Sequence, residues 1–214
     1  MLADFRAAIL AGLGLDPIVR PARHTVTAVF PEHGGFLLGV QDAMAFVEGL
    51  FPDVLFRTLP GQRQYDLREY RDVSADTTVF IAADRQASHL AALLPVGSAA
   101  IFFDCLDGGK SVRYRSDATM WTNMDNLRDV RAFRCTAHWW VPHTWMQPQM
   151  YYTVSLADLL PSEPSPPCNA QRFRVDNCRI AHMTLLALVS SSEDMGLPIS
   201  PHYHEALRAA CPGV

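Results

Sequence analysis

Short apolar runs that alternate with helical or polar stretches constrain the fold more than any other feature of the sequence. Such runs are typical of parallel strands that helices cover on both faces. Strands joined through helices form right-handed crossovers. We therefore predict an α/β fold, a Rossmann-like three-layer domain with a mainly parallel sheet and a C-terminal helical extension. The four clearest runs are HTVTAVF (24–30), DVLFRTL (53–59), TTVFIA (77–82) and AAIFFDC (99–105).

Periodicity and proline or glycine stops predict the remaining elements. The segment between residues 59 and 76 is predicted to be a polar connection with one helical turn. Two later apolar runs predict strands within 132–140 and 150–156. Helices are expected over residues 2–13, 37–50, 85–94, 178–190 and 204–210.

A proline- and serine-rich stretch, PSEPSPP, is the one clear linker signal. It predicts a Rossmann-like domain over residues 1–160, a linker over 161–168, and a helical extension over 169–214. The extension is expected to pack on the same domain.

Composition narrows the functional classes. The 214 residues are 49% apolar with a net charge of −4, which argues against disorder and against general attraction to nucleic acid or anionic membranes. We identify no signal peptide or membrane-spanning run, so no membrane association is expected. The odd cysteine count without a CxxC motif predicts reduced thiols in a cytoplasmic protein. The five cysteines are Cys105, Cys135, Cys168, Cys178 and Cys211.

The glycine turn after the first strand is the first candidate site. In α/β sheets, ligands bind at the carboxyl ends of the strands. Gly34 and Gly35 let a backbone approach a ligand closely, and the following helix offers free N–H groups. The turn, PEHGGF, matches neither GxGxxG nor GxxxxGK[ST]. It is therefore either a cofactor loop or a strand-to-helix turn that needs positive φ.

Several motifs follow one another between Arg23 and Leu156: the loop over 31–36, Tyr65-Asp66-Leu67, and Asp84 after VFIAA. LAALLPVGSAAIFF and QMYYTVSL come later. This order resembles class I S-adenosylmethionine-dependent methyltransferases, in the branch that methylates 2′-hydroxyls of ribosomal RNA and viral caps. The loop is similar to that branch's proline-glycine-glycine-phenylalanine loop, with an insertion.

The resemblance implies a methyltransferase-like domain that binds S-adenosylmethionine and acts on RNA or a small molecule. Asp66 would lie beside the adenosine, Asp84 would be the catalytic aspartate on the acceptor side, and no metal would be needed. The cofactor-binding residues would be Glu32, Gly34, Gly35, Phe36 and Asp66.

The chain departs from the family pattern at several charged positions. Asp104 stands where the 2′-O branch has a lysine, and the lysine-aspartate-lysine-glutamate tetrad is absent. Arg57-Thr58 stands where an acidic residue usually holds the cofactor ribose. A methyltransferase that relies only on the orientation of donor and acceptor would not need these residues. A Rossmann-like domain that has lost catalysis would not need them either.

Two further groups of residues leave alternatives open. Asp104 and Asp107, in FFDCLDGGK, suit a divalent ion in a sugar-nucleotide glycosyltransferase, but DGG is also ordinary turn chemistry. Cys135, His138 and His143 are spaced loosely like zinc ligands, and Cys178, His182, His202 and His204 occur later in the chain. Residues 139–148 are rich in tryptophan and proline. This stretch suits a contact with a protein partner or a second copy, in a structural domain of a larger assembly.

Overall fold

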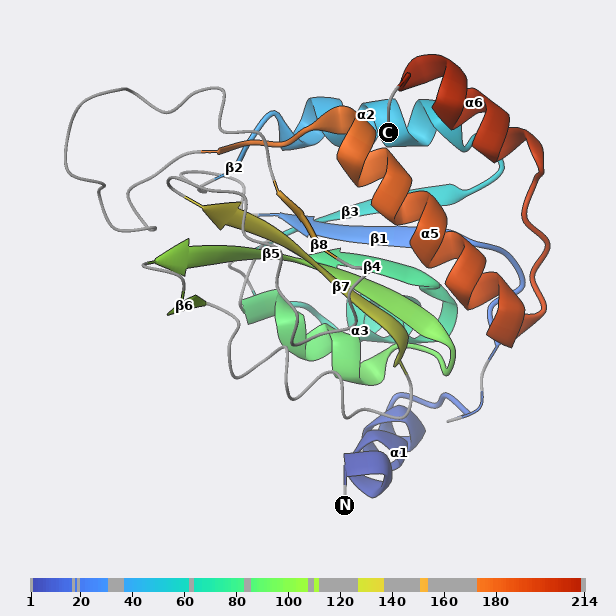
Figure 1. Ribbon diagram of the computed structural model, residues 1–214. Coiled ribbons are helices and arrows are strands. Elements are labelled where there is room, and N and C mark those ends of the chain that lie inside the picture. The colour runs from blue at the N-terminus through green and yellow to red at the C-terminus, as the bar shows by residue number, and fades with distance from the viewer. Residues whose placement is uncertain are drawn as a thin grey trace.

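A computed structural model describes residues 2–16, 18, 20–30, 37–61, 64–82, 86–107, 110–111, 127–136, 151–153 and 173–212. Its main sheet has seven strands in the order β3-β1-β4-β5-β7-β8, with β6 paired to the outer part of β5 (Figure 1). The strands on this path all pair in parallel, and β6 alone runs antiparallel. The fold is therefore α/β, as the apolar runs predict. The strands of this sheet are β1 (Thr25–Phe30), β3 (Leu55–Pro60), β4 (Val79–Ala82), β5 (Ser98–Asp107), β6 (Lys110–Ser111), β7 (Leu127–Thr136) and β8 (Tyr151–Thr153).

Helices cover both faces of this sheet. On one face, Val26, Ala28 and Phe30 of β1 join a buried cluster with α2, α5 and α6. On the other face, Val29 joins a second buried cluster with α3 and η1. Alternate residues of one strand therefore enter different cores, because successive side chains of a strand point to opposite faces. The helices are α1 (Leu2–Gly12), α2 (Val40–Leu50), α3 (Leu67–Asp76), the 3₁₀ helix η1 (Gln86–Leu93), α5 (Asn177–Met195) and α6 (His202–Ala210).

The crossovers between the central strands share one hand. From β1 the chain passes through α2 to β3 on one side, and from β3 it passes through α3 to β4 on the opposite side of β1. The second crossover runs across the sheet in the opposite direction to the first, and its helix α3 lies on the opposite face from α2. The crossover from β4 through η1 to β5 keeps both direction and face. This consistency agrees with the right-handed rule for parallel crossovers.

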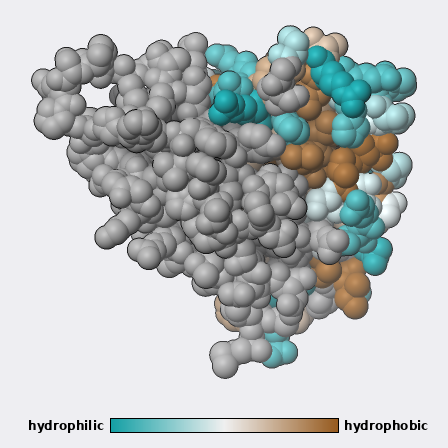
Figure 2. Space-filling model, in the orientation of Figure 1, coloured by the Kyte–Doolittle hydropathy of each residue, from teal (hydrophilic) through white to brown (hydrophobic). Residues whose placement is uncertain are grey.

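The C-terminal helices belong to the layer that covers β1 and β4. Helix α5 packs on α2 and on β4, β5 and β7, and α6 packs on α5 and α2. In Figure 2 apolar atoms gather over α5, whose sequence carries no charged residue between Arg179 and Glu193. A short parallel pair, β2 (Leu37–Leu38) with β9 (Phe173–Arg174), connects the starts of α2 and α5.

Several expected elements need correction. The segment between 59 and 76 contains the ten-residue helix α3, not a single turn. Leu37 and Leu38 form β2, so the expected 37–50 helix begins only at Val40. The fifth strand ends at Thr136, and the residues that follow it, like the 161–168 linker, lie outside the described part of the chain.

Two of the five cysteines form a disulfide, which contradicts the prediction of reduced thiols for this pair. Cys178 in the first turn of α5 is bonded to Cys211 at the end of α6, with the two Cα atoms 5.5 Å apart. The error arose because cysteine spacing in the sequence cannot reveal that two helix ends meet in space.

Within the described part of the chain, no helix combines the length and the apolar character needed to cross a bilayer.

Candidate functional site at the carboxyl edge of the sheet

The sheet has a topological switch point between β1 and β4. Strand β1 lies between β3 and β4, and Val29 is level with Ala82 in the β1–β4 register. The chain leaves the end of β1 toward β3 and leaves the end of β4 toward β5, in opposite directions. Ligands of open α/β sheets bind in the crevice that such a divergence leaves at the carboxyl edge.

The two loops that start at this switch point carry most of the predicted site residues. Residues 31–36 follow β1 directly, and residues 83–85 follow β4. Glu32, Gly34, Gly35, Phe36 and Asp84 all fall in these loops, outside the described residues. The strand ends that lead into the loops are buried, since Phe30 is 8% exposed and Ala82 is 0% exposed.

Helix α2 begins at this edge, and among the described residues no side chain caps its N-terminus. Its N-cap residue, Gly39, has the left-handed φ of 68° and makes no side-chain cap. By contrast, Asp176 caps α5 by accepting a hydrogen bond from the Arg179 amide at 2.9 Å. The first amides of a helix have no partner within the helix and carry a partial positive charge. The start of α2 therefore offers donors to an anionic or polar group.

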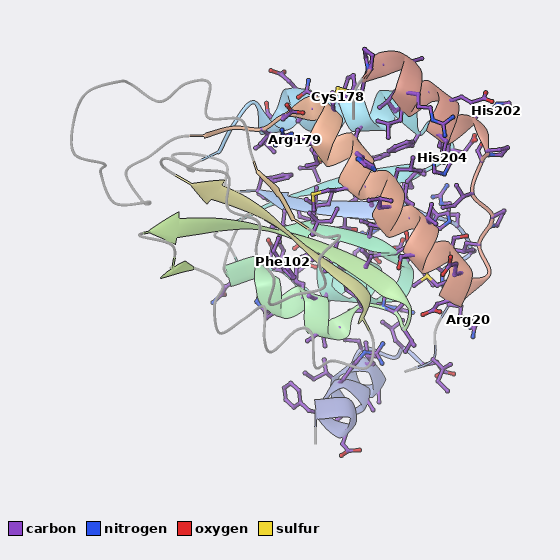
Figure 3. The ribbon with its side chains drawn as sticks, in the orientation of Figure 1. Arg20, Phe102, Cys178, Arg179, His202 and His204 are labelled. Atoms are coloured by element: carbon purple, nitrogen blue, oxygen red, sulfur yellow. A yellow bond between two sulfur atoms is a disulfide. The ribbon has the colours of Figure 1, made fainter. Side chains whose placement is uncertain are left out.

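The start of α5 lies beside the start of α2 because β9 pairs with β2. Figure 3 shows Cys178 and Arg179 in the first turn of α5, at the end nearer the carboxyl edge, and His202 and His204 on α6. Cys178 is committed to its disulfide with Cys211 and so is removed from any metal site.

Asp66 is the one predicted site residue that the structure describes. It is the N-cap of α3, and its Oδ1 accepts a hydrogen bond from the Glu69 amide at 2.8 Å. Glu69 returns the contact, because its Oε2 accepts a hydrogen bond from the Asp66 amide at 3.0 Å. The carboxylate is exposed and follows the end of β3. Carboxylate oxygens hold further lone pairs, so capping leaves Asp66 able to accept a hydrogen bond from a ligand.

An aromatic group that the sequence analysis missed lies beside Asp66. Tyr65 donates a hydrogen bond to the carbonyl of Pro60, the last residue of β3, at 2.9 Å. The Tyr65 ring meets the ring of Tyr70 edge-on, with centroids 6.1 Å apart. Tyr70 Oη in turn lies 2.9 Å from Nε2 of His89 on η1. No sequence pattern joins Tyr70 to His89, which are 19 residues apart.

Arg57 does not lie at the end of its strand, where the family pattern has an acidic residue. Strand β3 continues to Pro60, and the Gly61 amide donates a hydrogen bond to the Phe30 carbonyl at 2.7 Å. Arg57 instead makes a two-fold ion pair with Asp76 at the end of α3, with N–O distances of 3.0 and 2.8 Å. The side chain therefore ties α3 to the sheet.

Asp104 and Asp107 lie within β5 and do not follow it. The neighbouring strand β4 ends at Ala82, level with Phe102, so β5 extends beyond it at the carboxyl edge. In the antiparallel register of β5 and β6, the backbone of Asp107 lies opposite that of Lys110. Gly108 and Gly109 lie outside the described residues, so the interpretation of DGG as turn chemistry stays a prediction.

Among the described residues, no group of three or more metal-ligating side chains could hold an ion. Cys135 is part of β7. His138 and His143, and the contact stretch 139–148, lie outside the described residues. His202 is exposed on α6, where its Nδ1 lies 3.6 Å from Glu205 Oε2.

The perturbed titratable groups lie at the opposite, amino edge of the sheet. Burial lowers the pKa of Arg6, which donates to the Leu94 carbonyl at 2.7 Å, and burial also lowers the pKa of His24. Burial, together with the charge of Asp53, raises the pKa of Tyr203. Because these three groups lie at the start of the sheet, away from the candidate site, we attribute their shifts to packing and not to catalysis.

Comparison with models of known protein families finds no match, and comparison with curated proteins finds none either.

Proposed function

We propose that this chain binds S-adenosylmethionine at the switch point between β1 and β4 and acts as a methyltransferase on RNA or a small molecule. In this proposal the loop from Glu32 to Phe36 contacts the cofactor, Asp66 accepts a hydrogen bond from the adenosine, and Asp84 lines the acceptor side. The finer description of the fold as Rossmann-like, with a C-terminal helical extension, is part of the same proposal.

The observation that carries the proposal is the divergence of the chain after β1 and β4. It puts the starting points of both motif-bearing loops, after Phe30 and after Ala82, next to each other. The double glycine and Asp84 were identified from sequence alone. The adjacency of the two strand ends that precede them supports the proposal, because Val29 and its register partner Ala82 are 53 positions apart in the sequence.

The described residues fit an adenosyl ligand in two respects. The N-terminus of α2 at Gly39, which no described side chain caps, provides amide donors for the polar carboxylate end of the ligand. Asp66, exposed at the start of α3, provides an acceptor for a ribose or adenine donor. When bound, the cofactor would supply an electrophilic methyl group, and the chain's contribution would be binding and orientation.

A second candidate ligand follows from the strand order. With the parallel strands numbered along the chain, the sheet runs 2-1-3-4-5-6. The flavodoxin-like order 2-1-3-4-5 binds FMN at the switch point between its first and third strands, whereas the order 3-2-1-4-5-6 belongs to dinucleotide-binding Rossmann folds. FMN therefore belongs beside the adenosyl compounds in any binding test.

The test is thermal unfolding and calorimetry with S-adenosylmethionine and S-adenosylhomocysteine. A ligand at a hundredfold excess over its dissociation constant adds about 2.7 kcal/mol to stability. We expect binding by the native chain, and its loss in Gly34→Arg and in Gly35→Arg. Gly12→Arg is the matched control, because Gly12 ends α1 with open space around its Cβ position.

Each alternative has its own result. Binding that survives both loop substitutions would refute the placement of the site. A response only to a UDP-sugar with manganese would favour a glycosyltransferase that uses Asp104 and Asp107, and a response only to FMN would favour a flavoprotein. No response to any ligand, with a dimer or larger species by light scattering, would favour a structural or interaction domain.

A further inference from the structure

The disulfide between α5 and α6 joins one accessible cysteine to one buried cysteine. Cys178 lies in the first turn of α5 (Figure 3) and is partly exposed, whereas Cys211 at the end of α6 is 2% exposed. The rates of thiol oxidation and of thiol–disulfide exchange both depend on access to the sulfur that reacts. Helix N-termini also stabilise thiolates. A reagent in solution therefore meets the pair at Cys178.

The buried residues of helix α6 form a single stripe. Tyr203, Leu207 and Cys211 recur every four residues and pack into the cluster that α6 shares with α2 and α5. The ring of Tyr203 lies against that of Phe51, with centroids 5.0 Å apart. An isolated nine-residue helix is unstable in water, so α6 depends on this stripe for its structure. The disulfide makes the last of the three anchors covalent.

We propose that Cys178 and Cys211 form a reversible redox switch that hydroperoxides oxidise and dithiols reduce, and that holds α6 docked in its oxidised state. An accessible thiol beside a second, resolving cysteine is the arrangement that redox-sensing proteins use. The inference goes beyond the proposed methyltransferase function and does not depend on any ligand at the carboxyl edge.

Formation of the bond starts at the accessible cysteine. In the reduced chain the Cys178 thiolate attacks one oxygen of the hydroperoxide, the O–O bond breaks, and the sulfur becomes a sulfenic acid. The other oxygen leaves with its electron pair and takes a proton from water. The Cys211 thiol then attacks the Cys178 sulfur, the S–O bond breaks, and the thiol proton leaves with the hydroxide as water. The cysteine pair is oxidised and the peroxide is reduced.

Reduction also begins at the accessible cysteine. A thiolate of the dithiol attacks the Cys178 sulfur, the disulfide bond breaks, and Cys211 leaves as a thiolate that takes up a proton. The second thiol of the reagent then displaces Cys178 and closes the reagent's own disulfide. Without the covalent anchor α6 is held by packing alone, so it opens locally and uncovers the apolar side chains beneath it.

The first test follows this chemistry in the folded full-length chain. Dithiothreitol should reduce the bond without denaturant, and hydrogen peroxide should restore it. Peptide mass spectrometry reads the link between Cys178 and Cys211 at each step. If the bond yields to dithiothreitol only after denaturant is added, or if peroxide does not restore it, the disulfide is purely structural and the inference is wrong.

Single variants test which cysteine reacts first. In reduced Cys211→Ser, peroxide should leave a sulfenic acid at Cys178 that dimedone traps, because no second thiol resolves it. In reduced Cys178→Ser, the buried Cys211 should give no dimedone adduct. Equal labelling of the two cysteines, labelling of Cys211 alone, or labelling of neither would contradict the proposed order of steps. Circular dichroism checks that both variants fold.

Hydrogen exchange tests the effect of the switch on α6. In the reduced chain the amides of residues 204–210 should exchange faster than those of β1, at rates that low concentrations of denaturant do not change, as local opening requires. Peroxide should restore their protection in the wild type but not in the double variant Cys178→Ser and Cys211→Ser. If the amides of α6 and β1 exchange at the same rate in the reduced chain, α6 opens only with the whole fold, and the inference fails.

Discussion

A buried histidine at the amino edge of the sheet, His24, contributes to the pH dependence of stability. His24 directly precedes β1 and is 6% exposed. Among the described residues, neither of its ring nitrogens meets a partner with full hydrogen-bond geometry. Burial lowers its pKa, and the nearby Leu197 backbone opposes this only in part. The folded chain therefore binds a proton at His24 less readily than the unfolded chain does.

The sign of the resulting pH dependence follows from that difference. Below about pH 6.5, an unfolded histidine becomes protonated. The unfolded state then binds more protons than the folded state, so the free energy of unfolding decreases as the pH is lowered. The loss continues until the pH passes the lowered pKa of the folded state. We expect His24→Phe, which keeps a ring without titrating, to flatten this slope in denaturant unfolding between about pH 5 and 8. An unchanged slope would contradict the assignment to His24, and His202→Phe serves as the exposed control.

At the scale of elements, the largest error of the sequence analysis was helix α3. The signal was present, because Asp66 and Glu69 have the spacing of a capping box. The charged residues Arg68, Arg71 and Asp72 obscured it, since they point to solvent and give the segment a polar composition. Arg68 and Asp72, 3.9 Å apart, form the local ion pair expected of a solvated helix face. For a helix that buries few of its residues, a capping box is a better sequence signal than hydropathy.

The cap also allows the two roles of Asp66 to be separated. Asp66→Ala should lower stability by about 1 kcal/mol, because the α3 amides lose their acceptor. Asp66→Asn should leave stability nearly unchanged, since asparagine caps equally well. If the carboxylate binds adenosine, Asp66→Asn should still weaken S-adenosylhomocysteine in calorimetry. Equal affinity of wild type and Asp66→Asn would restrict Asp66 to the cap.

The disulfide between Cys178 and Cys211 joins two helices and stabilises their packing. It closes a loop with a sequence separation of 33, for which loop-closure entropy gives about 3–4 kcal/mol of stabilisation. We expect reductant to lower the denaturation midpoint of the wild type. The double variant Cys178→Ser and Cys211→Ser should match the reduced protein and no longer respond to reductant. Mass spectrometry that counts five free thiols in the native protein would overturn the pairing.

For the whole molecule, sequence reasoning gave the α/β class but not the strand order. Runs such as TTVFIA and AAIFFDC show burial on both faces, yet they hold no information on which strand lies beside them. The adjacency of β1 and β4, on which the candidate site depends, therefore became visible only in the fold. The same holds for the pairing of Tyr70 with His89. The cytoplasmic location stays a prediction, and the disulfide weighs against it because disulfides are rare in reducing compartments.

The whole molecule is also expected to divide into a sheet core and a separable α1. Figure 1 shows α1 apart from the helices that flank the sheet. Its contacts run mainly to η1, and Arg6 donates a hydrogen bond to the Leu94 carbonyl that follows η1. Leu10 is fully buried, while Phe5 is 62% exposed. Strands β1 and β4 are buried along their whole length. Segments with few buried contacts open locally, without global unfolding.

Hydrogen exchange tests this division directly. Leu10→Ala removes the main apolar anchor of α1, so amides of residues 4–12 should exchange faster while those of β1 and β4 keep their native protection. Val29→Ala is the matched comparison, because Val29 lies in the buried cluster between β1 and α3. It should speed exchange in β1 and β4 through the global unfolding equilibrium and leave exchange in the locally opening α1 unchanged. If Leu10→Ala instead lowers protection equally in α1, β1 and β4, the helix belongs to one cooperative unit with the sheet. Its undocking would then report on the stability of the whole fold.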